Sequence, residues 1–279
     1  MSYRTILYAI DEDPLAEAHV DHAAQLARTF EGRLVGLGCH RPTPWPRDGA
    51  VAFIEGDPLT LELRAAEEAA VAREEVFLQR CRLAGLAASE AILENTEMAS
   101  AVCRHAVEAD LVVVTQPPGS GAQHAERQRR AHVILQDCIR PVLMLPRTGR
   151  FAPLPSVVLV AWDGSGGAAR AATAALPLLR RAAAVHLVQV ASHHEDTAPL
   201  RPGIERAATW LSGHGVAVRA DVVSSILPAG EAISTQVAHG GAELLVMGAW
   251  GHSRVVERVL GGATRTMVDR MIVPVLFAH

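Results

Sequence analysis

The chain alternates short apolar runs with longer, mixed stretches from one end to the other. Continuous apolar runs predict strands over residues 4–10, 33–39, 87–93, 110–115 and 141–146. Intervening stretches, many of them rich in Ala, Leu, Glu and Arg, predict helices over residues 14–30, 59–84, 98–108 and 124–138. Runs that are continuous rather than alternating are typical of parallel strands covered by helices on both faces.

The same series of elements then occurs a second time. Strands are predicted over residues 156–162, 184–191, 216–223, 243–248 and 272–278. Helices are predicted over residues 166–182, 202–214, 229–240 and 253–270. Asp11 and Asp163, which each follow a first strand, are 152 positions apart, and the second strands match at an offset of 153. The fourth and fifth strands match at 133, which places one insertion of about twenty residues in the middle of the first copy.

The repeat predicts two α/β domains, each an open, mostly parallel sheet with helices on both faces. Residues 146–155 contain three prolines and a glycine, a composition that suits a boundary between domains. We therefore expect a first domain over residues 1–148 and a second over residues 154–279.

Composition narrows the class of function. The 279 residues carry a net charge of -4, which argues against a nucleic-acid binder that relies on a basic surface. All 26 basic residues are Arg, so a phosphate-binding Lys, a Schiff-base Lys and a Lys general base are excluded. No apolar run reaches the ~18–20 residues that span a bilayer, and we expect no secretory signal. The four cysteines form no C-x-x-C pair, so a reducing cytoplasm is the expected location.

One loop in the second copy carries candidate chemistry. The strand that includes Met247 is followed by the pattern G-x2-G-x9-G, formed by Gly248, Gly251 and Gly261. Glycines let backbone N–H groups approach an anion closely, and a helix opening near Ser253 adds a favourable dipole end. If the fourth strand pairs with the first, this loop faces Asp163 across the crevice where open α/β sheets bind ligands. The pattern predicts a phosphate site.

With these motifs the chain resembles the universal stress protein family, and specifically its members with two fused copies. The resemblance is strongest over residues 157–165 and 244–279, including Gly251-His252-Ser253-Arg254. It implies a five-stranded sheet in the order 3-2-1-4-5 in each copy and an ATP site at the switch point. It also implies that the two fifth strands pair antiparallel, so that the chain is an internal pseudo-dimer.

The resemblance further implies a set of nucleotide-contacting residues in the second copy. Asp163 would contact the adenosine end, and the backbone of Val190 would contact the adenine. The ribose and phosphates would be surrounded by Gly248, Gly251, Gly261, Gly262, Ala263 and Thr264, with Ala161, Trp162, Met247, His252, Ser253 and Arg254 beside them. The expected ligand is ATP or AMP with Mg²⁺. Trp162 and Trp250 either stack on the adenine or fill its space, and Arg254 either reaches a phosphate or is an exposed first-turn residue.

The first copy lacks the glycines. The offset of 133 places Thr115, Pro118 and Gln128 at the three glycine positions. We expect this copy to be degenerate and kept for packing. Its basic residues Arg127, Arg129 and Arg130 form either a phosphate or partner patch or, as we favour, a solvated helix face.

We see no residue set for turnover, and so expect a sensor or regulator with at most slow ATP hydrolysis that reports to an unknown protein partner. Three alternatives remain open. The chain could be an interaction module that binds no nucleotide, an enzyme of the wider adenine-nucleotide α-hydrolase group, or a metal binder through His193-His194-Glu195-Asp196. Ser165 is expected to be a helix N-cap rather than a nucleophile. A homodimer is a further possibility.

Overall fold

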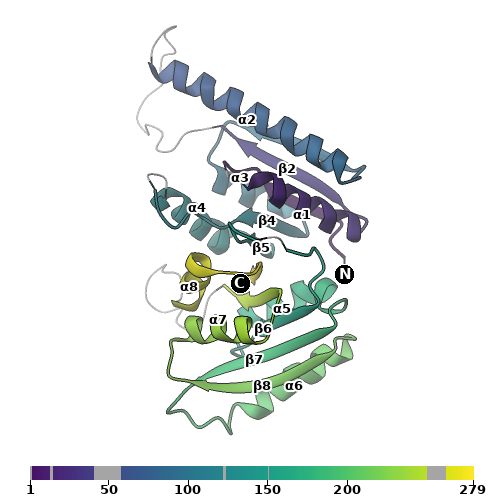
Figure 1. The fold of residues 1–279 in the computed structure, drawn as a ribbon, viewed down its shortest axis with the longest axis vertical. Helices are drawn as coiled ribbons and strands as arrows, with labels where there is room; N and C mark the ends of the chain where they lie inside the picture. The colour runs from purple at the N-terminus through teal and green to yellow at the C-terminus, as the bar shows by residue number, and fades with distance from the viewer. Residues whose placement is uncertain (1, 13–14, 41–57, 122–123, 150, 250–261) are drawn as a thin grey trace.

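The computed structural model describes residues 2–12, 15–40, 58–121, 124–149, 151–249 and 262–279 (Figure 1). The elements of the first half are β1 (Thr5–Ala9), α1 (Ala16–Thr29), β2 (Arg33–Cys39), α2 (Pro58–Leu83), β3 (Ser89–Glu94), α3 (Met98–His105), the 3-10 turn η1 (Ala106–Glu108), β4 (Leu111–Thr115), α4 (His124–Asp137) and β5 (Val142–Leu145). Those of the second half are β6 (Val157–Ala161), α5 (Gly166–Leu179), β7 (Ala184–Ser192), α6 (Arg201–Gly213), β8 (Val218–Ser225), α7 (Ala229–His239), β9 (Leu244–Gly248), α8 (Gly262–Arg270) and β10 (Val275–Ala278).

The strands form one ten-stranded sheet in the order β3-β2-β1-β4-β5-β10-β9-β6-β7-β8. Each half contributes five parallel strands in the order 3-2-1-4-5, and the halves join through the antiparallel pair β5–β10. The predicted fold class and the predicted internal pseudo-dimer are both confirmed. Within the β5–β10 pair, Leu143 lies opposite Leu276, and these are equivalent residues 133 positions apart. An approximate two-fold axis therefore passes between them.

The predicted insertion lies between β2 and β3. The helix in this part of the first half, α2, has 26 residues, whereas its counterpart α6 has 13. In Figure 1 the long helix α2 lies along one end of the molecule and the short helix α6 at the other.

The register between the two copies differs from the prediction at one strand. Ala9 of β1 pairs with Leu37 of β2, and Ala161 of β6 pairs with Val188 of β7. The second strands are therefore offset by 188 − 37 = 151 positions, not 153. A slip of two residues keeps every side chain on the same face of the sheet, so the apolar pattern could not detect it.

The outer strands β3 and β8 each begin two residues after their predicted starts, and the turn before them explains why. Both α2 and α6 are followed by a glycine with positive φ, Gly85 at 71° and Gly215 at 79°. The next residue, Leu86 or Val216, donates its backbone N–H to the helix carbonyl five positions back, at 3.0 and 3.2 Å. This is the Schellman arrangement, whose last residue packs against the helix. The buried Leu86 and Val216 therefore belong to helix ends, although their apolar character suggested strands.

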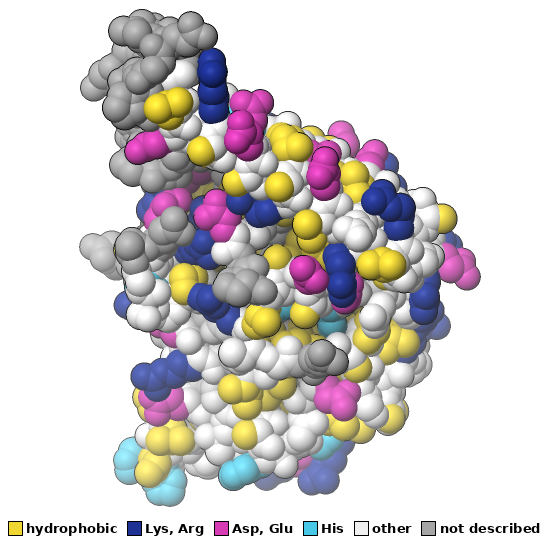
Figure 2. All heavy atoms as spheres, turned by 45° about the horizontal axis from the view of Figure 1, so that its top comes forward, with side chains coloured by type: hydrophobic (Ala, Val, Ile, Leu, Met, Phe, Trp, Pro, Cys, Tyr) yellow, Lys and Arg dark blue, Asp and Glu magenta, His cyan; other side chains and the backbone are white. Residues whose placement is uncertain are grey.

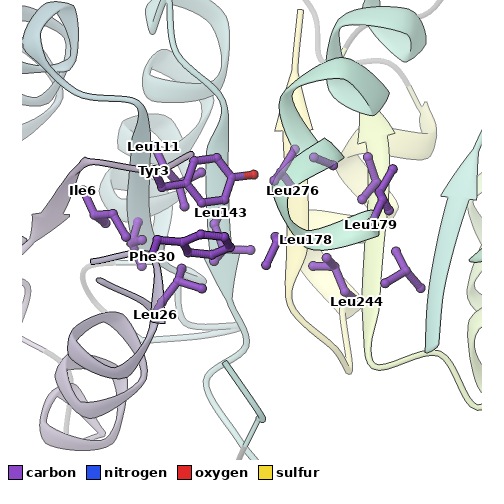
Figure 3. Close-up of a cluster of buried hydrophobic side chains, with 14 of the residues drawn as sticks. Tyr3, Ile6, Leu26, Phe30, Leu111, Leu143, Leu178, Leu179, Leu244 and Leu276 are labelled. Atoms are coloured by element: carbon purple, nitrogen blue, oxygen red, sulfur yellow. The ribbon is translucent and has the colours of Figure 1, made fainter. Parts of the chain in front are cut away.

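Buried side chains form two clusters, one on each face of the sheet, and both draw residues from the two halves. At the junction, Tyr3 and Phe30 of the first half approach Leu178 and Leu276 of the second (Figure 3). The Tyr3 hydroxyl donates a hydrogen bond of 2.6 Å to the carbonyl oxygen of Ala174 on α5. The two halves thus share continuous apolar packing as well as a strand pair.

Acidic and basic side chains are interspersed over the face drawn in Figure 2, without a large area of one sign. In the part of the chain that the structure describes, no helix has both the length and the apolar character needed to cross a membrane.

Candidate functional site

The predicted site lies at the point in the second half where the order of the strands across the sheet reverses. Strands β6 and β9 are parallel neighbours, and β7 lies on the other side of β6. The helices that follow β6 and β9 cover opposite faces, because α5 packs into one buried cluster and α8 into the other. The carboxyl ends of β6 and β9 therefore flank a topological switch point, the place where open α/β sheets bind ligands.

A tight turn displays Asp163 at the end of β6. Its Oδ1 accepts a hydrogen bond of 2.9 Å from the backbone N–H of Ser165, and Gly164 between them has a φ of 75°. The Ser165 hydroxyl accepts a hydrogen bond of 3.1 Å from the backbone N–H of Ala168, which confirms Ser165 as the N-cap of α5. Asp163 is exposed, and the turn places it beside the first turn of α5.

The end of β9 packs tightly against the same turn. A Cβ on Gly248 would lie 2.8 Å from the backbone N of Ala168 and 2.9 Å from the backbone C of Gly167. Only glycine at position 248 allows β9 and the start of α5 to come this close. Close packing therefore requires a glycine at position 248, in addition to any role in ligand binding. The motif alone did not reveal this requirement.

Thr264 differs from its predicted role. The resemblance places Thr264 around the ribose and phosphates, but the residue is 2% exposed and its hydroxyl donates a hydrogen bond to the carbonyl oxygen of Ala249. This contact ties the first turn of α8 to the segment after β9. The hydroxyl therefore holds the start of α8 in place, and the backbone is the part of this residue that could face a ligand.

The structure brings together four predicted residues and separates a fifth. Ala161, Val190, Met247 and Ala263 all belong to, or pack against, the buried cluster on the α7–α8 face of the sheet. Trp162 is half-buried and packs against the cluster on the opposite face, with residues of α5 and α6. Trp162 therefore neither stacks in nor fills the α7–α8 side of the switch point. The remaining predicted residues of the loop, Trp250, Gly251, His252, Ser253, Arg254 and Gly261, lie outside the described residues.

The corresponding crevice in the first half is closed by ion pairs. Arg130 of α4 contacts Asp11 at 3.2 Å and Glu126 at 3.2 Å, and Arg127 contacts Glu12 at 3.5 Å. The cavity bounded by these residues and the ends of β1 and β4 measures only about 20 Å³. A nucleotide needs a cavity of at least several hundred Å³. The first switch point is therefore filled by the chain's own side chains.

These contacts correct our expectation of a solvated helix face. The side chains of Arg127 and Arg130 are only 12% and 22% exposed, whereas Arg129 is 55% exposed. Arg127 and Arg130 are three residues apart and so lie on one face of α4. This spacing was the sequence signal that the two side chains could turn toward the same crevice. Their partners Asp11 and Glu12 come from another element, so the sequence could not pair them.

Two buried histidines on α1, His19 and His22, are polar residues that the sequence analysis missed. Their spacing of three residues along one helix face was a signal, but nothing in the pattern showed that the face would be covered by the linker. Among the described residues no group of three metal-ligating side chains forms, so His193, His194 and their acidic neighbours give no metal centre there.

The four cysteines are all free thiols. Cys81 and Cys138 are buried, while Cys39 and Cys103 are partly exposed. Burial raises the pKa of Cys39 and of Cys103 to about 12, and that of Cys81 to about 11. Such thiols remain protonated at neutral pH and are poor nucleophiles.

Comparisons with known proteins agree with this architecture. No curated protein is similar enough to the chain to count as a match. A universal stress protein from Archaeoglobus fulgidus has a similar structure, with a TM-score of 0.77 at 18% identity over 98% of this chain and 95% of that one. A functionally unknown protein from Pseudomonas aeruginosa has a TM-score of 0.61 at 16% identity, over 99% and 92% of the two chains. At identities this low, the structural similarity shows a shared fold and nothing more.

The sequence model of the universal stress protein family matches residues 2–146. This stretch covers more than half of the chain and is the half whose glycine loop is lost. The chain belongs to the universal stress protein family.

Proposed function

We propose that residues 154–279 form a second domain of this family, fused to a first domain over residues 1–148, and that the second domain alone binds an adenine nucleotide. ATP is the first candidate and AMP the second, with Mg²⁺ on the phosphates. The observation that carries the proposal is the difference between the two switch points. Arg130 pairs with Asp11 in the first half, whereas Ala263 occupies the position equivalent to Arg130 in the second. Ala263 cannot extend a side chain toward Asp163.

The described residues support this assignment chemically. The carboxylate of Asp163 can accept hydrogen bonds from ribose hydroxyls or the adenine amino group. If α8 begins at Gly262, the backbone N–H groups of Gly262 to Thr264 need partners outside the helix, and the helix dipole there favours negative charge. The family resemblance adds the backbone of Val190 for the adenine and the loop residues Gly248, Gly251, His252, Ser253, Arg254 and Gly261 for the ribose and phosphates.

The proposed role is that of a sensor or regulator in a stress response. The chain has no Lys, and the described cysteines hold their protons at neutral pH. Binding without appreciable turnover would let occupancy follow the nucleotide concentration, and an occupied site would be reported to a protein partner.

Native mass spectrometry in Mg-ATP tests the proposal with a matched pair of variants. The full chain should carry one nucleotide, because the side chains of Arg130 and its neighbours fill the first switch point. Asp163→Asn should weaken binding about tenfold, the usual effect of one lost hydrogen bond of this kind. Asp11→Asn, the equivalent change in the first half, should leave occupancy unchanged.

Two outcomes would contradict the proposal. A chain that stays bare at millimolar Mg-ATP would favour an interaction module that binds no nucleotide. Loss of the nucleotide in Asp11→Asn, with retention in Asp163→Asn, would move the site to the first half.

A further inference from the structure

A groove lies between helix α1 and the linker that joins the two halves. It is lined by Leu15, Glu17, Ala18, His19, Asp21, His22 and Gln25 of α1, by Arg80 of α2, and by Gly149 and Phe151 of the linker. Its volume is about 560 Å³, within the range of small-molecule sites. The groove is in the first half and the linker, away from the proposed nucleotide site.

Two buried histidines of α1 hold the linker at this groove. His19 Nε2 lies 3.0 Å from the carbonyl oxygen of Pro146, and His22 Nδ1 lies 3.1 Å from that of Phe151. A carbonyl oxygen only accepts, so each of these nitrogens carries a proton and donates it. The tautomer of each neutral ring is thereby fixed.

The second nitrogens of the two rings differ. For His19, the Thr115 hydroxyl donates to Nδ1 at 3.3 Å, so both nitrogens are engaged. For His22, the described residues provide a partner for Nδ1 only, and Nε2 keeps its lone pair. Burial lowers the pKa of His22 to about 4, with a smaller lowering by the neighbouring His19. His22 is therefore neutral at physiological pH and contributes one spare hydrogen-bond acceptor to the groove wall.

The charged residues of the groove leave a negative balance. Arg80 donates from Nε to Asp21 at 2.8 Å and from Nη1 to Glu17 at 3.3 Å, and its Nη2 also contacts Asp21. Two carboxylates thus face one guanidinium, and all three of its nitrogens contact them. Phe151, Leu15 and Ala18 add apolar surface. Such a wall favours a ligand with positive charge, an N–H donor and an apolar body.

We propose that this groove is a second ligand site, which takes a small organic cation, an amine or amidine, whose N–H group donates to Nε2 of His22. The cation is balanced by Glu17 and Asp21, and its apolar part lies against Phe151. The linker forms part of the wall, so an occupied groove would also hold the linker against α1.

Benzamidine is a suitable probe, because it combines an amidinium with an aromatic ring. Its binding to the full chain is followed by NMR titration, using the ¹⁵N shift of His22 Nε2, with saturating Mg-ATP present. Benzamide, which has nearly the same shape without the charge, is the matched ligand control. We expect benzamidine to bind and to shift the Nε2 resonance, and benzamide to bind at least tenfold more weakly.

His22→Asn is the informative variant, because an asparagine amide can still donate to the Phe151 carbonyl but has no atom in place of Nε2. It should weaken benzamidine binding about tenfold or more while unfolding like the parent. His214→Asn, at the end of α6 in the second half, makes the same substitution far from the groove and should bind as the parent does.

Each contrary result overturns the proposal in a defined way. Absence of benzamidine binding up to about 10 mM, or competition with Mg-ATP, removes the site. Equal binding of benzamide removes the requirement for a cation. Parent-like binding by His22→Asn removes the role of Nε2. None of these results bears on nucleotide binding in the second half.

Discussion

Arg129 and Arg130 are successive residues of α4 in very different surroundings. Arg130 lies in the closed crevice of the first half and contacts Asp11 and Glu126, while Arg129 pairs with Glu97 on the surface. Arg130→Ala should lower the free energy of unfolding by about 1–2 kcal/mol, because it leaves the partly buried Asp11 carboxylate without its cation. Arg129→Ala should cost less than about 0.5 kcal/mol. Urea unfolding measures both, and equal losses would show that Arg130 does not hold this crevice.

His22 should make stability depend on pH over a defined window. Its pKa is 6.5 in the unfolded chain and about 4 in the folded one, because burial disfavours the charged ring. Between these values the unfolded state binds more protons, so stability falls as the pH drops from 6.5 to about 4. The total loss should be about 3 kcal/mol. Urea unfolding from pH 7.5 to 4.5 measures it, and His22→Asn should remove this component; an unchanged slope would place the titration elsewhere.

Single residues with local roles were predictable, and residues that act through distant partners were not. Ser165 as an N-cap and Asp163 at a strand end follow from the order of residues along the chain. The closure of the first crevice by Arg130 depends on a contact with Asp11, 119 positions away. The burial of His22 depends on the linker, 129 positions away. Both are products of tertiary packing, which a local pattern does not encode.

At the scale of elements, the packing of β9 on the start of α5 depends on Gly248. An added Cβ would meet the backbone of Gly167 and Ala168, which cannot move aside as a flexible side chain could. Gly248→Ala should therefore destabilise the protein by about 1–3 kcal/mol, the usual cost of overpacking. Gly262→Ala is the matched control, because a Cβ there has no described atom within 4 Å. It should change stability by less than about 0.5 kcal/mol. Thermal unfolding compares the two, and an equally harmless Gly248→Ala would refute the close packing.

Element type was more predictable than element ends and register. Every predicted strand and helix has its counterpart, because apolar runs and helix-forming stretches alternate so regularly. The starts of β3 and β8 were misplaced, since Leu86 and Val216 close helix ends through the glycines before them. The offset of β7 was wrong by two positions, since a slip of two preserves the face on which each side chain lies.

At the scale of the whole molecule, the order of strands in the second half is the same as in the first. The sequence repeat predicted this symmetry because the two copies keep the same succession of elements. Two of the differences between the halves are Arg130 against Ala263 at the switch point, and α2 against the shorter α6. One half can thus lose a ligand crevice while both halves keep the fold.

The junction between the halves leads to a prediction about assembly. Because Leu143 and Leu276 are equivalent residues that face each other across the approximate two-fold axis, two copies of one half could pair in the same register. A fragment of residues 154–279 would expose the edge of β10 and the apolar side chains that α5 presents to Tyr3 and Phe30. An uncovered strand edge with an apolar face favours pairing with another chain. We therefore expect this fragment to form a homodimer through β10 at micromolar concentration, as measured by sedimentation equilibrium.

A variant distinguishes that pairing from unspecific association. Leu276→Asp in the fragment would place two carboxylates opposite each other on the two-fold axis of the homodimer, where like charges repel. It should shift the fragment toward the monomer or unfold it, and circular dichroism separates these cases. Arg219 is an exposed residue of the outer strand β8. The fragment with Arg219→Ala keeps β10 intact and should therefore remain dimeric. A folded fragment that stays monomeric at roughly 1 mM would show that β10 needs β5 specifically, and that the two halves have diverged at their junction.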